Sequence, residues 1–527
     1  MDIIIPMAGR SERFFDAGYR QHKWMLELGG ELIIAHVIKM FSPDDTFHLV
    51  LNTKQAEEIP DIFDRLKCLA GKLTITVIEP HDFGPTFSAL QVERIEAGNE
   101  IIIAYCDGTC EWNYQHFLWH ARGNDGGVPA FRGFHPASCG STYYAYIRSD
   151  GDKFQEIREK KSFTENRMNE CASVGVYYFS SWKLFQTYAK KALDDAFNTG
   201  QESYISLVYN YMVKDDLRII VHEVNRFICL GTPEDVQQYF FWWDYFYKNR
   251  NHTFSEKLSR QVKRINLLPI VEEATVAENA ESRLSAALIP IQEEPVAVRV
   301  ARSLPDADRW SFLPCKKDLS RYPLELAFKK FQANCTITPL DQSKDNLASA
   351  CLHAVSGFAD EDELLIASCD SEVRYDAESW QRIIEDSSVD GAVWAFRMGS
   401  ALCSNFSTLS YCKLKKDGKY IEEILVNQTI SENPNADNVA VGHFWFRQCG
   451  ALKRASESEL EYCSAKRENW LLKVINDLIQ DGAKFALFEV EQWVNFRDPL
   501  CYKVFNFWED YFFKAERPRL INPSLSK

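Results

Sequence analysis

The chain has 527 residues and a formal net charge of −15, with 46% hydrophobic and 26% charged residues. This composition is that of a globular protein with buried cores, and the length indicates two or more domains of the usual ~100–200 residues. Because no basic run occurs, the sequence excludes a nucleic-acid-binding protein, which needs clustered cations for phosphate contacts.

The compartment follows from the first residues and the cysteines. The opening MDIIIPMAGR lacks the cationic region and the long apolar stretch of a secretory signal. No uninterrupted apolar run approaches the ~18 residues of a membrane-spanning helix. Fifteen cysteines are scattered along the chain without a CxxC pair, so we expect reduced thiols and no zinc site. We therefore expect a cytoplasmic protein with neither membrane nor nucleic acid as a partner.

Apolar runs alternate with helical stretches along the first half of the chain. The sequence predicts strands at Ile3–Pro6, Phe47–Leu51, Leu73–Ile78 and Glu100–Tyr105. It predicts helices at Leu32–Phe41, Ala56–Leu66 and Thr86–Ile95, and a later helix that starts near Pro233 and packs its aromatic face on the core. Strand–helix alternation with continuous apolar strands predicts an α/β fold, a mostly parallel mixed sheet covered by helices.

The chain repeats itself at a nearly constant offset, which is the strongest signal of its organisation. IIIAYCDGTCEW (101–112) is similar to LLIASCDSEVRY (364–375), and IIIPMAG (3–9) to NLLPIVE (266–272). GGELIIAHVIKMF (29–41) matches QEEPVAVRVARSL (292–304) at the same offset of 263. Two later matches show the offset drifting by only a few residues: CASVGVYYF (171–179) with DNVAVGHFWF (437–446), and YFFWWDYF (239–246) with FNFWEDYF (505–512). We predict two tandem domains, 1–250 and 264–527, with a linker at about 251–263.

A loop of small residues, PMAGRSERF (6–14), directly follows the first predicted strand. Parallel sheets bind ligands at the carboxyl ends of their strands. Backbone N–H groups there can hold phosphates, and Arg10 and Arg13 would add positive charge. Taken alone, the loop is equally well a plain turn, and Lys23, which follows it, would more often be a solvated surface lysine.

Several motifs in order resemble the nucleotide-sugar pyrophosphorylases and related cytidylyltransferases. They are AGRSERF (8–14), Lys23, the Gly29–Gly30 turn, Glu79–Pro80, FGPT (83–86), YCDGT (105–109), Gly140, Glu159–Lys160, Gly175 and GTPED (231–235). The resemblance covers nearly all of 1–250. It implies Rossmann-like, glycosyltransferase-A-like nucleotidyltransferase domains.

The resemblance also assigns roles to residues. It implies that Arg13 holds the leaving pyrophosphate, that Lys23 reaches the α-phosphate of a nucleoside triphosphate (NTP), and that Asp107 holds Mg²⁺. The remaining nucleotide contacts would come from Ala8, Gly9, Arg10, Ser11, Glu79, Gly84 and Thr86. The phosphorylated acceptor would be held by Gly140, Glu159, Lys160 and Gly175.

Three positions depart from the family pattern. Ser11 replaces a loop glycine, which a loop with less demanding dihedrals would tolerate. His22 replaces the proline before the lysine. Cys229 occupies the usual position of a second metal-binding aspartate, so Mg²⁺ would be held by Asp107 and phosphates alone, or with help from another carboxylate such as Glu223.

The sequence also resembles the bacterial capsule-cluster nucleotidyltransferases, through PMAG…RF, the aspartate motif, GFHP (133–136) and GST (140–142). This resemblance implies transfer of a nucleoside monophosphate to a sugar phosphate or another small phosphorylated metabolite, with CTP as the first choice of NTP. The base, the acceptor and any homo-oligomer remain open. A glycosyltransferase and a non-catalytic nucleotide-binding regulator are the alternatives; the first more often carries a DxD motif, which CDGT is not.

The second copy has lost most of these residues. At the matching offsets Gly9 and Arg10 become Glu272 and Glu273, and Lys23 becomes Ala286. Glu159–Lys160 become Val426–Asn427, Arg13 becomes Val276, and Gly231–Thr232 become Arg497–Asp498; only Asp370 survives. Because two glutamates would repel a triphosphate, we expect a degenerate copy, with a changed activity such as sugar transfer as the alternative.

Overall fold

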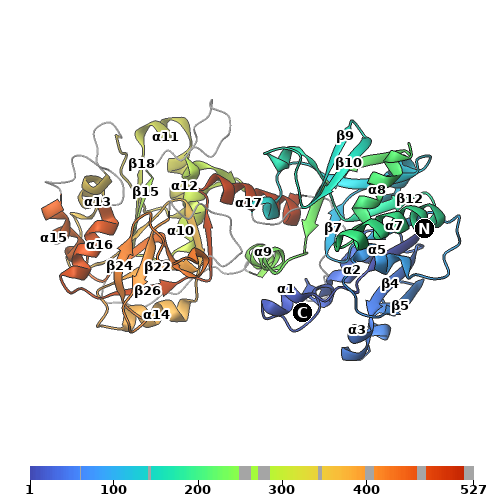
Figure 1. Ribbon diagram of the computed structural model, residues 1–527. Coiled ribbons are helices and arrows are strands. Elements are labelled where there is room, and N and C mark those ends of the chain that lie inside the picture. Colours follow the sequence, from blue (N-terminus) through green and yellow to red (C-terminus); the bar gives the residue numbers. More distant parts are fainter. Residues whose placement is uncertain are drawn as a thin grey trace. The chain divides into compact units, whose positions relative to one another are not determined.

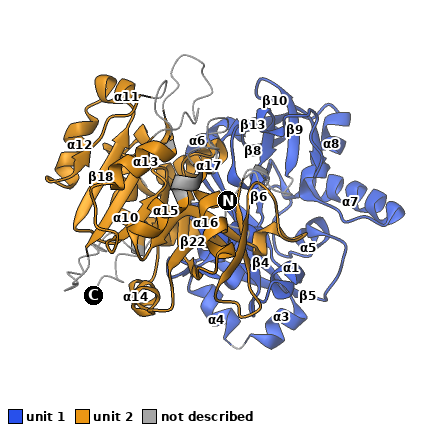
Figure 2. Cartoon of the chain, turned by 90° about the vertical axis from the view of Figure 1, so that its left-hand side faces the viewer, with its two compact units in different colours: residues 1–240, 515–527 blue, residues 241–514 orange. Residues whose placement is uncertain are grey.

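A computed structural model describes residues 1–59, 61–139, 144–248, 263–270, 285–341, 347–397, 409–459 and 470–514 (Figure 1). These residues form two compact units, residues 1–240 and residues 241–514 (Figure 2). The division falls inside one helix, α9 (Pro233–Trp243), whereas the sequence predicts a boundary near 250, which stays a prediction. Within the described residues, no helix combines the length and the apolar character needed to cross a bilayer.

Unit 1 is built on a ten-stranded sheet of order β11-β9-β10-β13-β8-β12-β6-β1-β4-β5. Its strands are β1 (Asp2–Pro6), β4 (Thr46–Asn52), β5 (Leu73–Ile78), β6 (Ile101–Ala104), β8 (Gly126–Phe131), β9 (Ala145–Asp150), β10 (Lys153–Glu159), β11 (Cys171–Ser173), β12 (Val176–Phe179) and β13 (Ile219–Glu223). Two small ribbons pair β2 (Glu27–Leu28) with β3 (Glu31–Leu32) and β7 (Gly108–Glu111) with β14 (Arg226–Cys229).

Helices cover both faces of this sheet. They are α1 (Glu12–Asp16), α2 (Ile33–Ile38), α3 (Thr53–Glu58), α4 (Ile62–Lys67), α5 (Pro85–Leu90), α6 (Tyr114–Ala121), α7 (Trp182–Thr199), α8 (Ile205–Lys214) and α9. Successive residues of β1 alternate between two apolar clusters, Ile3 and Ile5 in one and Ile4 in the other. The first cluster includes residues of α2, α4 and α6, and the second includes residues of α5, α7 and α8. The unit is therefore a three-layer α/β fold.

The structure corrects three details of the sequence prediction. The sheet is mixed, as predicted, but it is not mostly parallel: β1, β4, β5 and β6 are parallel, whereas β12 is antiparallel to both of its neighbours and β9 to β10 and β11. The helix predicted over Ala56–Leu66 is two helices, α3 and α4, and Asp61 between them has a left-handed φ of 64°. The helix predicted over Thr86–Ile95 ends at Leu90.

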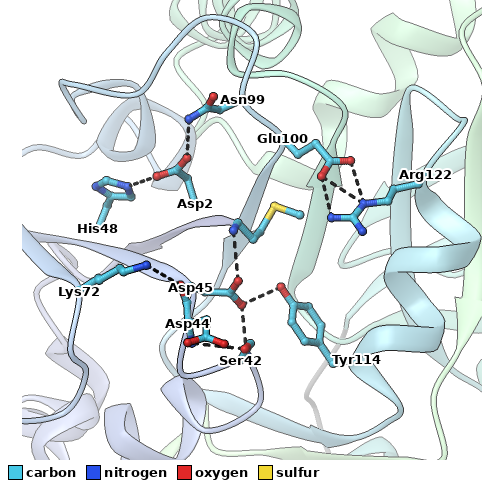
Figure 3. A network of polar contacts seen from close by, with 11 residues as sticks. Asp2, Ser42, Asp44, Asp45, His48, Lys72, Asn99, Glu100, Tyr114 and Arg122 are labelled. Carbon is cyan, nitrogen blue, oxygen red and sulfur yellow. Dashed lines mark hydrogen bonds and ion pairs between the residues drawn. The ribbon is translucent and has the colours of Figure 1, made fainter.

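A network of polar contacts joins the amino ends of three strands (Figure 3). Asp2, the first residue of β1, accepts hydrogen bonds from His48 Nε2 at 2.8 Å and Asn99 Nδ2 at 2.9 Å. Asp45, which precedes β4, is buried and accepts from the Tyr114 hydroxyl at 2.9 Å. These contacts fix one edge of the sheet and leave the carboxyl edge for ligands.

Unit 2 contains a second sheet of order β19-β18-β15-β20-β25-β22-β26, to which β23 and β24 are added. Its strands are β15 (Arg264–Ile270), β18 (Arg309–Pro314), β19 (Thr336–Ile337), β20 (Glu363–Ala367), β22 (Gly391–Arg397), β23 (Tyr411–Leu414), β24 (Ile421–Leu425), β25 (Asn438–Phe446) and β26 (Phe485–Glu489), with ribbons β16 (Pro290–Ile291)–β17 (Glu294–Pro295) and β21 (Ser371–Arg374)–β27 (Gln492–Asn495). Its helices are α10 (Val296–Ser303), α11 (Lys316–Arg321), α12 (Leu324–Phe331), α13 (Leu347–Val355), α14 (Ala377–Glu385), α15 (Cys449–Glu459), α16 (Trp470–Gln480) and α17 (Pro499–Glu509).

The two units share details at the offset seen in the sequence. When strands 263–267 residues apart are matched, the two sheets have the same order. It is β5-β4-β1-β6-β12-β8-β13 in unit 1 and β19-β18-β15-β20-β25-β22-β26 in unit 2. Left-handed φ values recur at Lys160 (53°) and Asn427 (52°). Asn210 of α8 makes two hydrogen bonds to the backbone of Ile157, and Asn476 of α16 makes the same two to Ile424.

These two asparagines provide a test of the shared architecture. Asn210→Ala and Asn476→Ala should each lower the free energy of unfolding by about 1–3 kcal/mol, because each leaves two backbone groups of a strand without their partner. Chemical unfolding followed by circular dichroism measures this change. Thr187→Ala, on the exposed face of α7, is the control. If either asparagine variant lowers the free energy of unfolding by no more than this control does, the shared contact does not stabilise that unit.

Candidate active site

Two side chains at the start of helix α3, those of its N-cap Asn52 and of Gln55, hold the loop that follows β1. Asn52 Nδ2 donates to the Ala8 carbonyl at 2.7 Å, and Gln55 Nε2 donates to those of Met7 and Gly9 at 2.9 and 3.1 Å. Asn52 and Gln55 also form a reciprocal cap at the start of α3, and both are buried. Sequence analysis missed these two residues, although an Asn-x-x-Gln pattern after an apolar strand is a helix-capping signal.

Ser11 has the left-handed backbone conformation that favours glycine, with φ 57° and ψ 28°. The expectation of less demanding dihedrals at this position is therefore wrong. Left-handed backbone costs an L-residue roughly 1–2 kcal/mol. The hydroxyl gives a compensation that glycine lacks, because Ser11 Oγ accepts the Lys23 backbone N–H at 3.3 Å and lies 3.4 Å from His22 Nδ1. Two departures from the family pattern, Ser11 and His22, thus contact each other.

Lys23 and Asp107 form an ion pair at the carboxyl edge of the sheet. Lys23 Nζ lies 2.5 Å from Asp107 Oδ2, and the two side chains are only 22% and 24% exposed. Burial acts to lower the pKa of Lys23, but the Asp107 carboxylate outweighs it, and the pKa is raised. Burial also raises the pKa of the neighbouring Cys106 thiol to about 12. Lys23 therefore stays protonated at neutral pH beside an uncharged thiol.

The two loop arginines differ in their surroundings. Arg13 Nη2 donates to the Gly231 carbonyl at 3.4 Å. A Cβ atom on Gly231 would lie only 3.3 Å from Asp107 Oδ2, so this glycine packs directly against the carboxylate. Arg10 instead forms an ion pair with Asp82 at 3.0 Å, and its side chain is half-exposed. The structure thus brings Arg13, Lys23 and Asp107 together, whereas Arg10 would have to leave Asp82 to reach a phosphate there.

Cys229, at the usual position of a second metal-binding aspartate, is engaged within the protein. Its Sγ donates to Asp235 Oδ2 at 3.2 Å, and burial raises the pKa of the thiol well above its ordinary value. Asp235 in turn accepts from the Thr232 backbone N–H and hydroxyl at 3.0 and 2.8 Å. GTPED is thus the capping box of helix α9. Glu223 forms an ion pair with Arg132 at 3.2 Å.

No cluster of three or more histidine, cysteine or acidic side chains that could hold a metal occurs in the described ranges.

The loop Phe83–Thr86, which is predicted to contact the nucleotide and is called the nucleotide loop below, is packed on the backbone of Ser203. Gly84 has φ 86°, and a Cβ atom there would lie 2.6 Å from the Ser203 carbonyl oxygen. Thr86 is fully buried and donates to the same oxygen from its backbone N–H at 3.2 Å and its hydroxyl at 2.9 Å. Glu79 is bonded by the Thr53 hydroxyl at 3.4 Å. The Thr86 hydroxyl is therefore used within the protein, and a nucleotide contact by this loop stays a prediction.

The predicted acceptor residues Glu159 and Lys160 contact the start of helix α8. Glu159 accepts a short hydrogen bond from the Ser206 hydroxyl, and burial raises its pKa. Lys160 Nζ donates to the Tyr204 hydroxyl at 2.9 Å. Burial and Glu202 raise the pKa of Tyr204, while Arg13 acts in the opposite sense. Lys160 thus contacts a tyrosine, Tyr204, that sequence analysis missed.

Gly175 and Gly140 complete the predicted acceptor set. Gly175 has φ 79°, and a Cβ atom there would lie 3.0 Å from the Tyr105 ring. Its carbonyl accepts the Tyr105 N–H at 2.9 Å. Gly175 therefore shapes the backbone beside the site, and Gly140 lies outside the described residues.

Asp370, the equivalent of Asp107 in unit 2, has an arginine partner. Arg497 Nε donates to Asp370 Oδ2 at 2.9 Å, and the Ser368 hydroxyl donates to Oδ1 at 2.5 Å. The Asp370 side chain is only 4% exposed. In the sequence match between the two units, Arg497 corresponds to Gly231, and the buried Ala286 corresponds to Lys23. Glu272, Glu273 and Val276 lie outside the described residues.

No protein-family model matches the chain, and no curated protein matches it. Solved structures do. A nucleoside-diphosphate-sugar pyrophosphorylase from Vibrio cholerae RC9 is 21% identical over 45% of this chain and 98% of its own, with a TM-score of 0.37. An inositol-1-phosphate CTP transferase from T. maritima is 10% identical over 47% and 97%, with a TM-score of 0.36. HddC from Yersinia pseudotuberculosis is 17% identical over 45% and 96%, with a TM-score of 0.34. Each similarity covers less than half of this chain.

The left-handed backbone of Ser11 leads to a prediction about stability. Both Ser11→Gly and Ser11→Ala lose the contacts with Lys23 and His22, but only alanine keeps the strain of a Cβ atom. Ser11→Ala should therefore be less stable than Ser11→Gly by about 1 kcal/mol, measured by chemical unfolding. Elsewhere in a chain the order is usually reversed, so an alanine variant as stable as the glycine variant would contradict the observed conformation.

Proposed function

We propose that residues 1–250 form a nucleotidyltransferase that moves a nucleoside monophosphate from an NTP to a small phosphorylated metabolite and releases pyrophosphate. The observation that carries the proposal is the Lys23–Asp107 pair at the carboxyl edge, with Arg13 beside Gly231. Two cations and one carboxylate side by side suit a triphosphate and its counter-ion. The motif order of the sequence supports the same chemistry.

The chemistry requires positioning and charge neutralisation more than covalent participation of the protein. A phosphate oxygen of the acceptor attacks the α-phosphorus in line; the new O–P bond forms as the bond to the β-phosphate oxygen breaks, and pyrophosphate leaves. Lys23, protonated through its pairing with Asp107, would stabilise negative charge at the α-phosphate. Arg13 would hold the leaving pyrophosphate. Lys160 would hold the acceptor phosphate, and Glu159 would bond acceptor hydroxyls or an amine.

Mg²⁺ is the cofactor that we propose, and the residues present could hold it through one carboxylate together with substrate phosphates. The ion usually keeps several waters and takes one or two carboxylates plus substrate phosphates. Asp107 would supply that carboxylate, since Cys229 is bonded to Asp235 and Glu223 is paired with Arg132. When bound, the ion would neutralise phosphate charge.

We propose that unit 2 is a degenerate copy of the same fold. The shared strand order and the paired details at Lys160/Asn427 and Asn210/Asn476 support a tandem repeat. The guanidinium of Arg497 neutralises Asp370, and buried Ala286 stands where a catalytic lysine would be needed. Both features argue against NTP chemistry in this unit.

CTP is our first choice of NTP, and capsule or surface polysaccharide synthesis our proposed role, both from the sequence resemblance. Screening the four NTPs against phosphorylated sugars and small phosphates, with pyrophosphate release as readout, tests the function. Sugar transfer from a nucleotide-sugar in place of pyrophosphate release would favour the glycosyltransferase alternative. Nucleotide binding without turnover would favour the regulator.

Removal of the Lys23 ammonium should abolish most of the activity. Lys23→Ala should cut turnover by two to three orders of magnitude, because losing one charge contact in the transition state costs about 3–4 kcal/mol. Pyrophosphate release under saturating NTP measures this. Lys39→Ala, which removes an exposed lysine from an ion pair with Glu31 at 2.5 Å, is the matched control. Equal activity of the two variants would exclude Lys23 from the site.

The contrast between the units predicts one NTP per chain. Calorimetric titration of the full chain should give a stoichiometry of one NTP, and Asp370→Ala should keep this stoichiometry and a turnover within a few-fold of that of the parent enzyme. Asp370→Ala removes one carboxylate partner of Arg497, whose side chain is 45% exposed, so the fold should tolerate the change. Two equivalent NTP sites would show that unit 2 is a second active unit.

A further inference from the structure

The short segment Glu202–Ser206, at the start of helix α8, touches the predicted nucleotide loop on one side. The Ser203 backbone N–H donates to the Phe83 carbonyl at 3.0 Å. The Ser203 carbonyl accepts both the backbone N–H and the hydroxyl of Thr86. The absence of a side chain at Gly84 permits this approach, since a Cβ atom there would overlap the Ser203 backbone. The segment and the nucleotide loop are thus held together at a single residue.

The same segment holds the acceptor pair on its other side. The Tyr204 hydroxyl accepts from Lys160 Nζ at 2.9 Å and donates to Glu202 Oε2 at 2.5 Å. The Lys160 ammonium lies 5.1 Å from the centre of the Tyr204 ring. Two residues further on, the Ser206 hydroxyl donates to the Glu159 carboxylate. Both members of the acceptor pair are therefore oriented by residues one and three positions after Ser203.

Helix α8 gives this segment a rigid base. Ile205, Val208 and Tyr209 are fully buried, and the Tyr209 hydroxyl bonds to the carbonyls of Gly127 and Tyr178 at 2.9 and 2.8 Å. Ser203, Tyr204 and Ser206 therefore share one anchored base, and the contacts of the nucleotide loop and of the acceptor pair meet on it.

We infer that segment Glu202–Ser206 couples the two halves of the active site, with Tyr204 and Ser206 as positioning residues for Lys160 and Glu159. The substrate roles of the two halves rest on the proposed function, but the mechanical coupling does not. Occupation of the nucleotide loop then sets the geometry of the acceptor pair. A change on the nucleotide side that reaches no acceptor atom should weaken acceptor binding.

Amide hydrogen exchange tests the coupling without any ligand. Thr86→Val keeps the shape of the side chain and removes the hydroxyl that bonds to Ser203; Tyr204→Phe removes the bond to Lys160. Both variants should speed exchange at residues 159–161 by about two- to tenfold, the factor equivalent to one hydrogen bond. Tyr211→Phe, which removes a hydroxyl that bonds to Asp195 of α7 rather than to Lys160, is the control. Unchanged exchange at 159–161 in Thr86→Val would overturn the coupling.

Kinetics test the positioning roles. Ser206→Ala and Tyr204→Phe should raise the KM for the acceptor by about two- to tenfold and leave the KM for the NTP unchanged, and Ser206→Thr should restore the acceptor KM by returning a hydroxyl. An equal rise in both KM values, or no rescue by threonine, would overturn these roles. If none of the four NTPs gives pyrophosphate release with the parent enzyme, the proposed function fails. Hydrogen exchange then still decides whether the coupling exists.

Discussion

The parallel pairing of β1 with both β4 and β6 is the constraint on which the site depends. Ile4 lies opposite His48 on one side and Ile103 on the other. Three strands therefore end at one edge of the sheet, and the chain leaves each of them in a different direction. The loop after β1, the helix cap after β4 and Asp107 after β6 meet there because parallel strands share their carboxyl edge.

A small residue lets these groups approach each other in unit 1, and a larger residue stands at the matching position of unit 2. Gly231 packs against the Asp107 carboxylate where a Cβ atom would lie 3.3 Å from it. At the same offset unit 2 has Arg497, whose guanidinium binds Asp370. Asp107 pairs with Lys23 in unit 1, whereas Asp370 pairs with Arg497 in unit 2. The same aspartate thus serves a potential reaction centre in one unit and a structural ion pair in the other.

Departures from the family pattern are matched by neighbouring side chains rather than tolerated singly. Ser11 adopts a backbone that glycine would adopt freely, and its hydroxyl bonds to the Lys23 N–H beside His22. Cys229 in place of an aspartate finds Asp235, which already caps helix α9. In both places a side chain unusual for its position gains a polar contact that the usual residue would not make.

The sequence by itself determined the α/β class, β1, β4, β5 and β6 to within about a residue, and the residues that gather at the carboxyl edge, because burial patterns and motif spacing are local. Strand direction was not local: β12 has the same apolar pattern whether parallel or antiparallel, and only its pairing with β6 and β8 decided. The break at Asp61 and the backbone of Ser11 were equally hidden, since a left-handed φ leaves no mark on hydrophobic periodicity. Asn52, Gln55 and Tyr204 act on residues 40 or more positions away. Hydrogen bonds across such distances exist only once the sheet has brought the loops together, and for that physical reason tertiary structure alone decided them.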